Sequence, residues 1–207
     1  DYMPDDAVEK ILSFWRMYGS EEYAGIVGLD ADQSGKVIGT RMPENLKASR
    51  LGELYSLYKV KGDKKLVYRT ELTRNTPPYP LFPGEKYCPL SYKYILIDQH
   101  YPLLIMNETL CHVEYLEDGS SLNMINQYKK NPKGFSFFRK VAMEHAPNFK
   151  EEFRESMHYV SSNLMIRNFR FLIESPKFFT TFFAIPLGIV LYLYIQKTNK
   201  HSILKSG

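Results

Sequence analysis

The side chains best suited to metal or redox chemistry are two cysteines and the histidines near them. Cys88 and Cys111 could form a disulfide in an oxidising compartment, which would stabilise the fold by about 3 kcal/mol. Together with His100 and His112 they also offer four metal-binding groups, but the spacings match no zinc motif. We therefore expect free thiols inside a mixed domain, with the disulfide as the alternative.

A second pattern offers oxygen ligands to a cation. Asp30, Asp32 and Ser34 stand at positions one, three and five of a stretch that resembles the start of an EF-hand calcium loop, and Gly35 stands where that loop turns sharply. Position twelve is Arg41, where the loop needs a bidentate Glu. The stretch is therefore predicted to be a polar hairpin turn. A calcium-responsive module or a membrane-anchored enzyme would need this loop or the histidines to converge with other groups.

The sequence contains no motif for nucleophilic or phosphate chemistry. It lacks a nucleophile elbow, a phosphate-binding loop and the H-E-x-x-H pattern, so we expect no enzymatic activity and no cofactor. The 27 Lys and Arg residues only slightly outnumber the 23 Asp and Glu, and three of these lysines follow the last apolar segment. This balance argues against nucleic-acid binding. The pair Lys64-Lys65 is predicted to be solvated loop charge.

An uncharged apolar run near the C-terminus predicts one transmembrane helix. The run covers 178–195, and eighteen helical residues span roughly 27 Å, close to the thickness of the hydrocarbon layer. Lys177 and Lys197 bound it, and aromatic residues crowd its two ends. We assign the transmembrane helix to 177–197 and a short basic tail to 198–207.

Small residues inside this segment predict helix packing. Thr180, Ala184 and Gly188 recur every four residues and are expected to dock on a neighbouring transmembrane helix, while Pro186 is expected to kink the segment. Basic residues on both flanks are expected to bind anionic lipid headgroups: Arg167, Arg170, Lys177, Lys197 and Lys200. Because three basic residues flank each side, the positive-inside rule does not give the orientation.

The remaining pattern predicts the α+β class, with a small mixed domain over 1–120 and a helical stem over 121–176. The mixed domain should contain an N-terminal helix at 5–18, followed by short antiparallel strands at 24–29, 36–41, 53–60, 66–72, 92–98, 101–106 and 111–116. The stem should contain helices at 121–130, 135–145 and 149–173. A proline-rich segment at 75–89 should cross the surface in extended form.

These features together predict a non-catalytic accessory or structural subunit of a multi-subunit membrane protein complex. We place it in the mitochondrial inner membrane, in a respiratory or ATP synthase assembly. Its expected partners are other membrane subunits, contacted through the transmembrane helix and the proline-rich segment, and anionic lipid. The sequence opens with Asp1, so it either has lost a targeting segment or begins internally. The alternative is a type I single-pass protein of the secretory pathway, with a Cys88–Cys111 disulfide and a glycan on Asn107.

Overall fold

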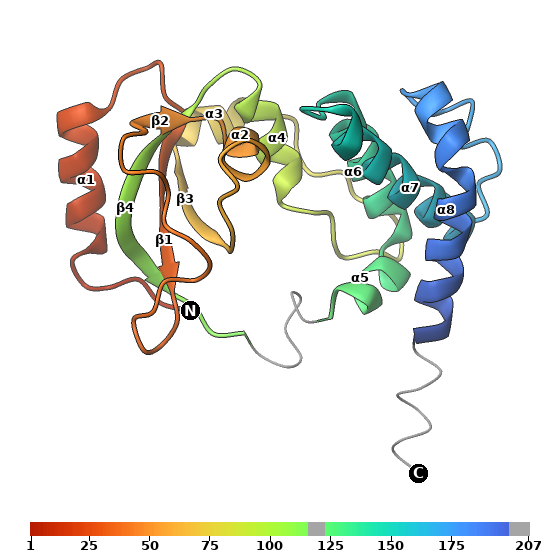
Figure 1. Cartoon of the computed structure of the whole chain (residues 1–207), viewed down its shortest axis with the longest axis horizontal. Coiled ribbons are helices and arrows are strands. Elements are labelled where there is room, and N and C mark those ends of the chain that lie inside the picture. The colour runs from red at the N-terminus through yellow and green to blue at the C-terminus, as the bar shows by residue number, and fades with distance from the viewer. Residues whose placement is uncertain (116–122, 199–207) are drawn as a thin grey trace, which may run out of the picture. The chain divides into compact units, whose positions relative to one another are not determined.

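The chain forms two compact units in a computed structural model that describes residues 1–115 and 123–198 (Figure 1). The mixed unit comprises Asp1–Pro77 and Lys93–Tyr115, and the helical unit comprises Pro78–Tyr92 together with 123–198. The predicted α+β class, with one long apolar helix at the C-terminal end, is confirmed. Most of the proline-rich segment, which the sequence assigned to the N-terminal domain, groups with the helices.

The mixed unit is built on a four-stranded sheet. Its strands are β1 (Gly25–Ala31), β2 (Ala48–Ser49), β3 (Lys64–Tyr68) and β4 (Leu103–His112), in the order β2-β4-β1-β3. The sheet is mixed, since β1 is antiparallel to β3 and parallel to β4. A parallel pair needs a crossover connection, and the chain between β1 and β4 supplies it with three helices as well as β2 and β3.

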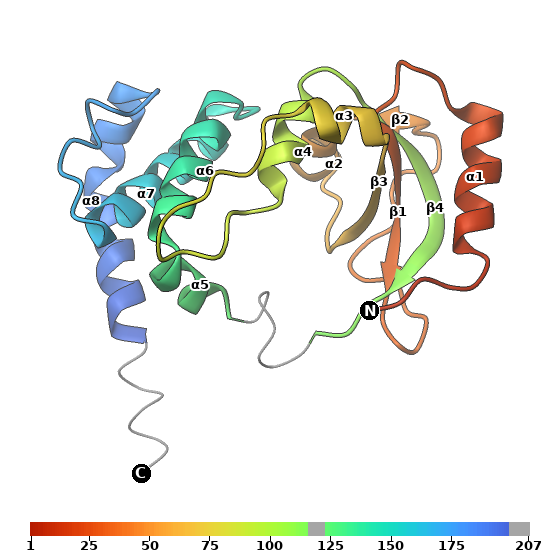
Figure 2. The ribbon, with the colours of Figure 1, turned by 180° about the vertical axis from the view of Figure 1, so that it is seen from behind.

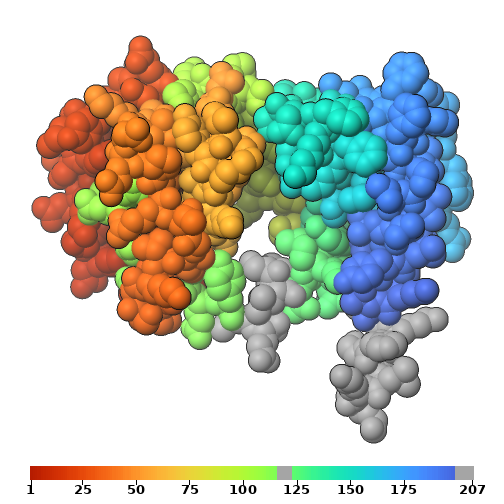
Figure 3. Space-filling view, in the orientation of Figure 1, coloured from red at the N-terminus to blue at the C-terminus, as the bar shows by residue number. Residues whose placement is uncertain are grey.

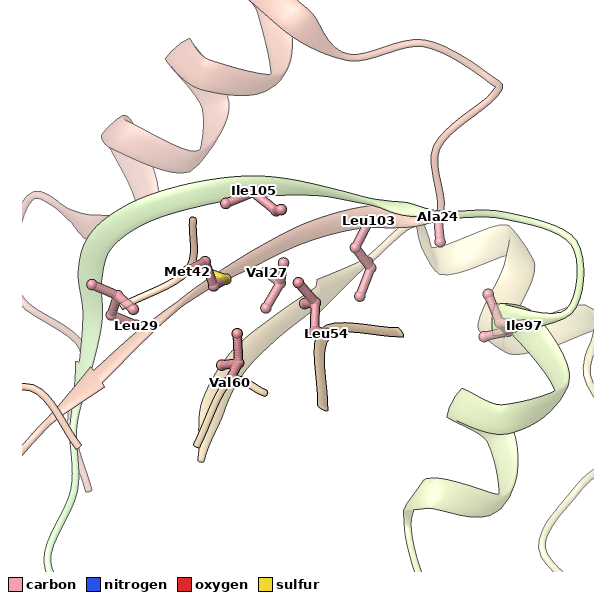
Figure 4. Close-up of a cluster of buried hydrophobic side chains, with 9 residues drawn as sticks. All are labelled: Ala24, Val27, Leu29, Met42, Leu54, Val60, Ile97, Leu103 and Ile105. Atoms are coloured by element: carbon pink, nitrogen blue, oxygen red, sulfur yellow. The ribbon is translucent and has the colours of Figure 1, made fainter. Parts of the chain in front are cut away.

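Helices cover both faces of this sheet. Helix α1 (Ala7–Tyr18) packs on one face, where Ile26 and Leu104 join its residue Ala7 in a buried cluster. Helices α2 (Leu51–Ser56), α3 (Thr70–Asn75) and α4 (Ser91–Asp98) lie on the other side, where the cluster of Figure 4 contains Val27, Leu54 and Ile97. Because neighbouring residues of a strand point to opposite faces, all seven residues of β1 are buried.

Several strand predictions are wrong. The run 92–98 belongs to helix α4, and the first half of the run 53–60 belongs to helix α2. The strand expected at 36–41 is reduced to a single bridge between Val37 and Ala31, and the strand expected at 66–72 ends at Tyr68. The run 101–106 and the described part of 111–116 lie in or next to one long strand, β4. The start of α2 is fixed from outside its own segment, because the carboxylate of Asp98 accepts the N–H groups of Leu51 and Gly52. A short apolar run does not by itself distinguish a strand from a helix, and these long-range contacts decide between them.

The predicted polar hairpin turn after β1 is confirmed. The carboxylate of Asp32 accepts hydrogen bonds from the N–H groups of Ser34 (2.9 Å) and Lys36 (3.0 Å) and from the Ser34 hydroxyl (2.6 Å). These bonds hold the pKa of Asp32 below its usual value. Gly35 supplies the positive φ of 84°. The Asp32 carboxylate and the Ser34 hydroxyl therefore close the turn, and no helix flanks it on either side.

A buried ammonium group organises the end of the sheet next to this turn. Lys64 was expected to be solvated, but it is only 7% exposed, and its Nζ donates to four backbone carbonyl groups: those of Ile38 (3.2 Å), Lys61 (2.8 Å), Gly62 (3.3 Å) and Asp63 (3.1 Å). Burial lowers the pKa of Lys64, and the nearby carboxylate of Asp30 opposes that shift. Asp30 is itself buried, with Oδ1 lacking a hydrogen-bond partner in the described part of the chain. Burial raises the pKa of Asp30, and the neighbouring Lys65, more than Lys64, opposes that rise.

The four helices of the helical unit are α5 (Met124–Lys130), α6 (Pro132–Glu144), α7 (Phe149–Met165) and α8 (Phe178–Thr198). The helix predicted over 149–173 is too long, because α7 ends at Met165 and Arg167 adopts a left-handed φ of 57°. Just beyond this turn Asn168 donates to the side-chain oxygen of the buried Asn163, which holds the chain back against α7 (3.0 Å).

The proline-rich segment packs on α6 of the same chain (Figure 2). The Glu85 carboxylate accepts the N–H groups of Lys133 and Gly134 at the start of α6 (2.9 and 2.8 Å). Asn131, just before α6, accepts the N–H of Tyr87 (3.1 Å), and a Cβ on Gly134 would lie only 2.4 Å from the Tyr87 carbonyl oxygen. The segment is thus an integral part of the helical unit.

We predict that Lys64→Met lowers the free energy of unfolding by about 2–4 kcal/mol, because it leaves four carbonyl groups without their donor and removes one of the two lysines that oppose the rise in the Asp30 pKa. Urea unfolding of the detergent-solubilised chain, followed through the single tryptophan Trp15 in this unit, measures the change. Lys36→Met on the exposed turn is the matched control and should change stability little. Equal effects of the two variants would contradict the prediction.

Candidate membrane-anchoring surface

Helix α8 is long and apolar enough to cross a membrane, as the sequence predicted for 178–195. Its 21 residues extend over about 31 Å at 1.5 Å per residue. The helix continues through Pro186 and reaches Thr198, with Lys197 as the basic residue of its last turn. Length and composition permit a membrane-spanning helix, and the contacts of α8 show which of its sides is free.

One side of α8 is fully occupied by the rest of the helical unit. Thr181, Ala184, Gly188 and Ile195 are buried along this side. At Gly188 a Cβ would lie 2.5 Å from the Cβ of Val160 on α7, so no side chain fits there without displacing the helix. Gly188 therefore sets how closely the two helices approach.

The two helices run parallel and in register. Thr180 at the start of α8 donates a hydrogen bond to the carboxylate of Glu152, and two turns later Gly188 meets Val160. Each pair is 28 residues apart in the sequence, and a constant offset is possible only for parallel helices. Near the other end of α8, Lys129 of α5 reaches the Gln196 carbonyl oxygen (3.5 Å). The helical unit therefore accompanies α8 along nearly its whole length.

The opposite side of α8 is exposed and apolar. Its large exposed residues are Phe178, Phe179, Phe182, Phe183, Leu187, Ile189, Val190, Leu193 and Tyr194. At 3.6 residues per turn they cover about half of the helix circumference. We call these nine residues the apolar half of α8, and the helix is visible along one face in Figure 3. A surface of this extent marks a site for lipid or for another protein.

The predicted packing residues have a partner within the chain. Ala184 and Gly188 are buried against the helical unit, and Thr180 is half-buried beside Glu152. Thr181, which the sequence analysis passed over, is the fully buried threonine, because positions 181, 184 and 188 follow the 3.6-residue period more closely than a strict interval of four. Docking of these residues on a neighbouring transmembrane helix stays a prediction.

The predicted headgroup-binding residues fall in three places. Arg167 and Arg170 are exposed in the connection between α7 and α8, Lys177 forms an ion pair with Glu152 (3.3 Å), and Lys197 is exposed. Lys200 lies outside the described residues. Phe169 and Ile173 in the same connection, which were not predicted, are also exposed, at 77% and 79%. The interleaving of basic and apolar residues in this stretch, typical of membrane interfaces, could have revealed them.

A polar cluster lies between α6 and α7. The carboxylate of Glu155 contacts the guanidinium of Arg139 and lies 3.1 Å from that of Arg154. Burial raises the pKa of Glu155, but Arg139 outweighs this effect and holds the pKa below its usual value. Burial, reinforced by Arg139, lowers the pKa of His158 to about 4. The cluster thus contains an ionised carboxylate and a neutral imidazole at physiological pH.

The two cysteines are free, as expected. Burial raises the pKa of the Cys88 thiol to about 11, which makes it a poor nucleophile at neutral pH. Cys111 is buried on β4, and next to it the Nδ1 of His112 lies 2.9 Å from the Asp32 carbonyl oxygen. Within 1–115 and 123–198 no three His, Cys, Asp or Glu side chains gather as metal ligands.

We predict that Gly188→Leu destabilises the helical unit by about 1–3 kcal/mol or more, because the added side chain overlaps Val160. Thermal unfolding of the detergent-solubilised chain, followed by circular dichroism, measures the effect. Val190→Leu on the apolar half is the matched control, since it adds one methylene at an exposed position. Unchanged stability in Gly188→Leu would show that α8 does not pack on α7 in this register.

We predict that His158 makes the helical unit less stable as the pH falls from about 6.5 towards 4. In this window the unfolded chain binds a proton at His158 and the folded chain does not, so stability decreases with falling pH by up to about 1.4 kcal/mol per unit. Unfolding free energies at several pH values should show a weaker dependence in His158→Gln than in the wild type. Parallel pH profiles for the two proteins would contradict the assignment.

Comparison with known proteins does not indicate a function for this chain. No protein-family model, no curated protein and no solved structure significantly matches this sequence or its fold. The surface that the structure offers for function is therefore defined by what α8 buries and what it exposes.

Proposed function

We propose that this protein is a non-catalytic accessory subunit of a multi-subunit membrane protein complex, attached to the membrane through α8. The observation that carries the proposal is the apolar half of α8, which exposes nine large apolar side chains and no charge before Lys197. Leaving such a surface in water is unfavourable, and a lipid or protein environment removes that cost.

The proposed environment is the mitochondrial inner membrane, in a respiratory or ATP synthase assembly. Exposed Arg167, Arg170 and Lys197 suit the anionic headgroups of that membrane, cardiolipin among them. The mixed unit would serve as the part that contacts other subunits. Its helix α1 leaves Val8, Leu12 and Met17 exposed, with Met17 at 70%, while the opposite side of α1 packs on the sheet.

Two observations weigh against the alternative of a glycosylated secretory protein. Both polar atoms of the Asn107 side-chain amide form hydrogen bonds with the backbone of Met42. Oδ1 accepts the Met42 N–H (3.0 Å), and Nδ2 donates to the Met42 carbonyl oxygen (2.9 Å). A glycan on Nδ2 would disrupt this pairing. The second observation is that Cys88 and Cys111 are free thiols, so the disulfide proposed for an oxidising compartment is not formed.

The proposal predicts that the tagged chain, expressed in its own cells, stays with mitochondrial membranes after a high-salt wash. After mild detergent extraction it should migrate with other membrane subunits on a native gel. Val190→Glu combined with Leu193→Glu should release the protein, because two charges then enter the apolar half. Gln196→Glu, which adds charge at an exposed polar position, should behave as the wild type. A wild-type protein that migrates alone would contradict the proposal.

A further inference from the structure

We propose that α8 binds the bilayer side-on: the helical unit stays docked along its buried side, and the apolar half lies in the membrane surface. This inference rests on the proposed attachment through α8 and specifies its geometry. Helix α8 is long enough to cross the membrane. If it did so while docked, the helices packed against it would have to enter the membrane as well.

A docked helical unit is incompatible with a spanning α8. The hydrocarbon layer is about 30 Å thick, so a spanning α8 would use its full length of about 31 Å to cross it. Because α7 runs in register with α8, the stretch between Glu152 and Val160 would lie at the depth of Thr180 to Gly188. Arg154 belongs to this stretch, and its side chain is 57% exposed. Crossing would therefore place an exposed guanidinium in hydrocarbon.

A second exposed ion pair lies beside the same stretch of α7. The Nζ of Lys140 on α6 lies 5.7 Å from the ring centre of Tyr159, the neighbour of Val160 on α7. Its carboxylate partner is Glu174 (3.6 Å), and both side chains are more than a third exposed. Ionised groups in the hydrocarbon layer are strongly disfavoured unless protein or water surrounds them. A spanning α8 would therefore have to leave the bundle.

Leaving the bundle would break up a packed core. Ile185 of α8 packs against the buried cluster that contains Met143, Tyr159 and Val160. The hydroxyl of the fully buried Thr181 donates to the sulfur of Met143 on α6 (3.9 Å). Separation would expose these apolar side chains and undo the Gly188–Val160 contact. The docked arrangement is thus part of the fold, and the bilayer can be reached without breaking it.

The exposed half of α8 has the dimensions of an interfacial helix. A helix with its side chains is about 10–12 Å across, so burying half of it in the bilayer requires an insertion of about 5–6 Å. Helices that lie in the membrane plane insert their apolar faces by about 5–10 Å. Phe179 and Lys197 are five full turns apart, which places Lys197 in line with the apolar half at its end. From there its ammonium can reach the headgroup layer. This lysine and the absence of charged groups across the nine residues of the apolar half favour lipid over a protein groove.

Tryptophan depth measurements test the inference on the full-length chain. Phe179→Trp, Phe183→Trp and Val190→Trp each place an indole on the apolar half without touching the buried side. The variants are bound to vesicles of phosphatidylcholine and phosphatidylglycerol containing lipids brominated at shallow or deep acyl positions. The quenching of the parent protein, which contains Trp15, is subtracted in each case. Val190→Glu is the control for binding, and we expect it to stay unbound.

Side-on binding predicts that all three indoles lie at one shallow depth, with the same ratio of shallow to deep quenching. A spanning helix predicts that position 190 lies about 10 Å deeper than position 179, because position 190 is two residues from the helix centre and position 179 is nine residues from it. That second result would overturn the inference and leave the membrane attachment intact. If the wild-type chain does not float with the vesicles, attachment to lipid through α8 and the side-on geometry both fail.

Discussion

The helical unit depends on the close approach of α8 to α7 at Gly188. At this point the two backbones are so near that a single methyl group would overlap Val160. The contact fixes the register of the parallel helices, which in turn aligns Thr180 with Glu152 and buries Thr181 and Ala184. It also decides which side of α8 is left free. The surface proposed for membrane attachment is therefore a consequence of packing inside the molecule as much as of the apolar composition of the helix.

Charged and polar side chains from distant parts of the sequence define the starts of helices and turns in both units. Asp98 receives the first amides of α2, and Glu85 receives those of α6, each across more than 40 residues of chain. Lys64 holds four carbonyl groups of two neighbouring turns and lies near the buried Asp30. The side chains of Asp98, Glu85 and Lys64 have backbone hydrogen-bond partners, as polar atoms usually have when they are buried. They specify where each element begins, a task that apolar packing alone performs poorly.

The sequence predicted features whose cause is local and missed those whose cause is distant. The apolar run of α8 and the helix α1 depend on composition and period, and both were predicted. The helices α2 and α4 were mistaken for strands, because Asp98 and the sheet that α4 covers lie far from the residues in question. The small residues of α8 predicted packing on a neighbouring transmembrane helix, whereas Ala184 and Gly188 contact the same chain, and a spacing pattern does not reveal which helix is the partner. The burial of Lys64 was missed for the same reason. The Lys64-Lys65 pair alone does not indicate that backbone carbonyl groups surround the ammonium group of Lys64.

The parallel arrangement of α7 and α8 has an electrostatic consequence. Each helix has a partial positive charge at its N-terminus, and two helices that begin side by side bring these like partial charges together. Glu151 and Glu152 lie in the first turn of α7, where they offset that charge. Glu152 does this for both helices, because its carboxylate also contacts Thr180 in the first turn of α8 and Lys177 just before it. One acidic side chain thus neutralises the shared positive end of a helix pair whose dipoles would otherwise repel.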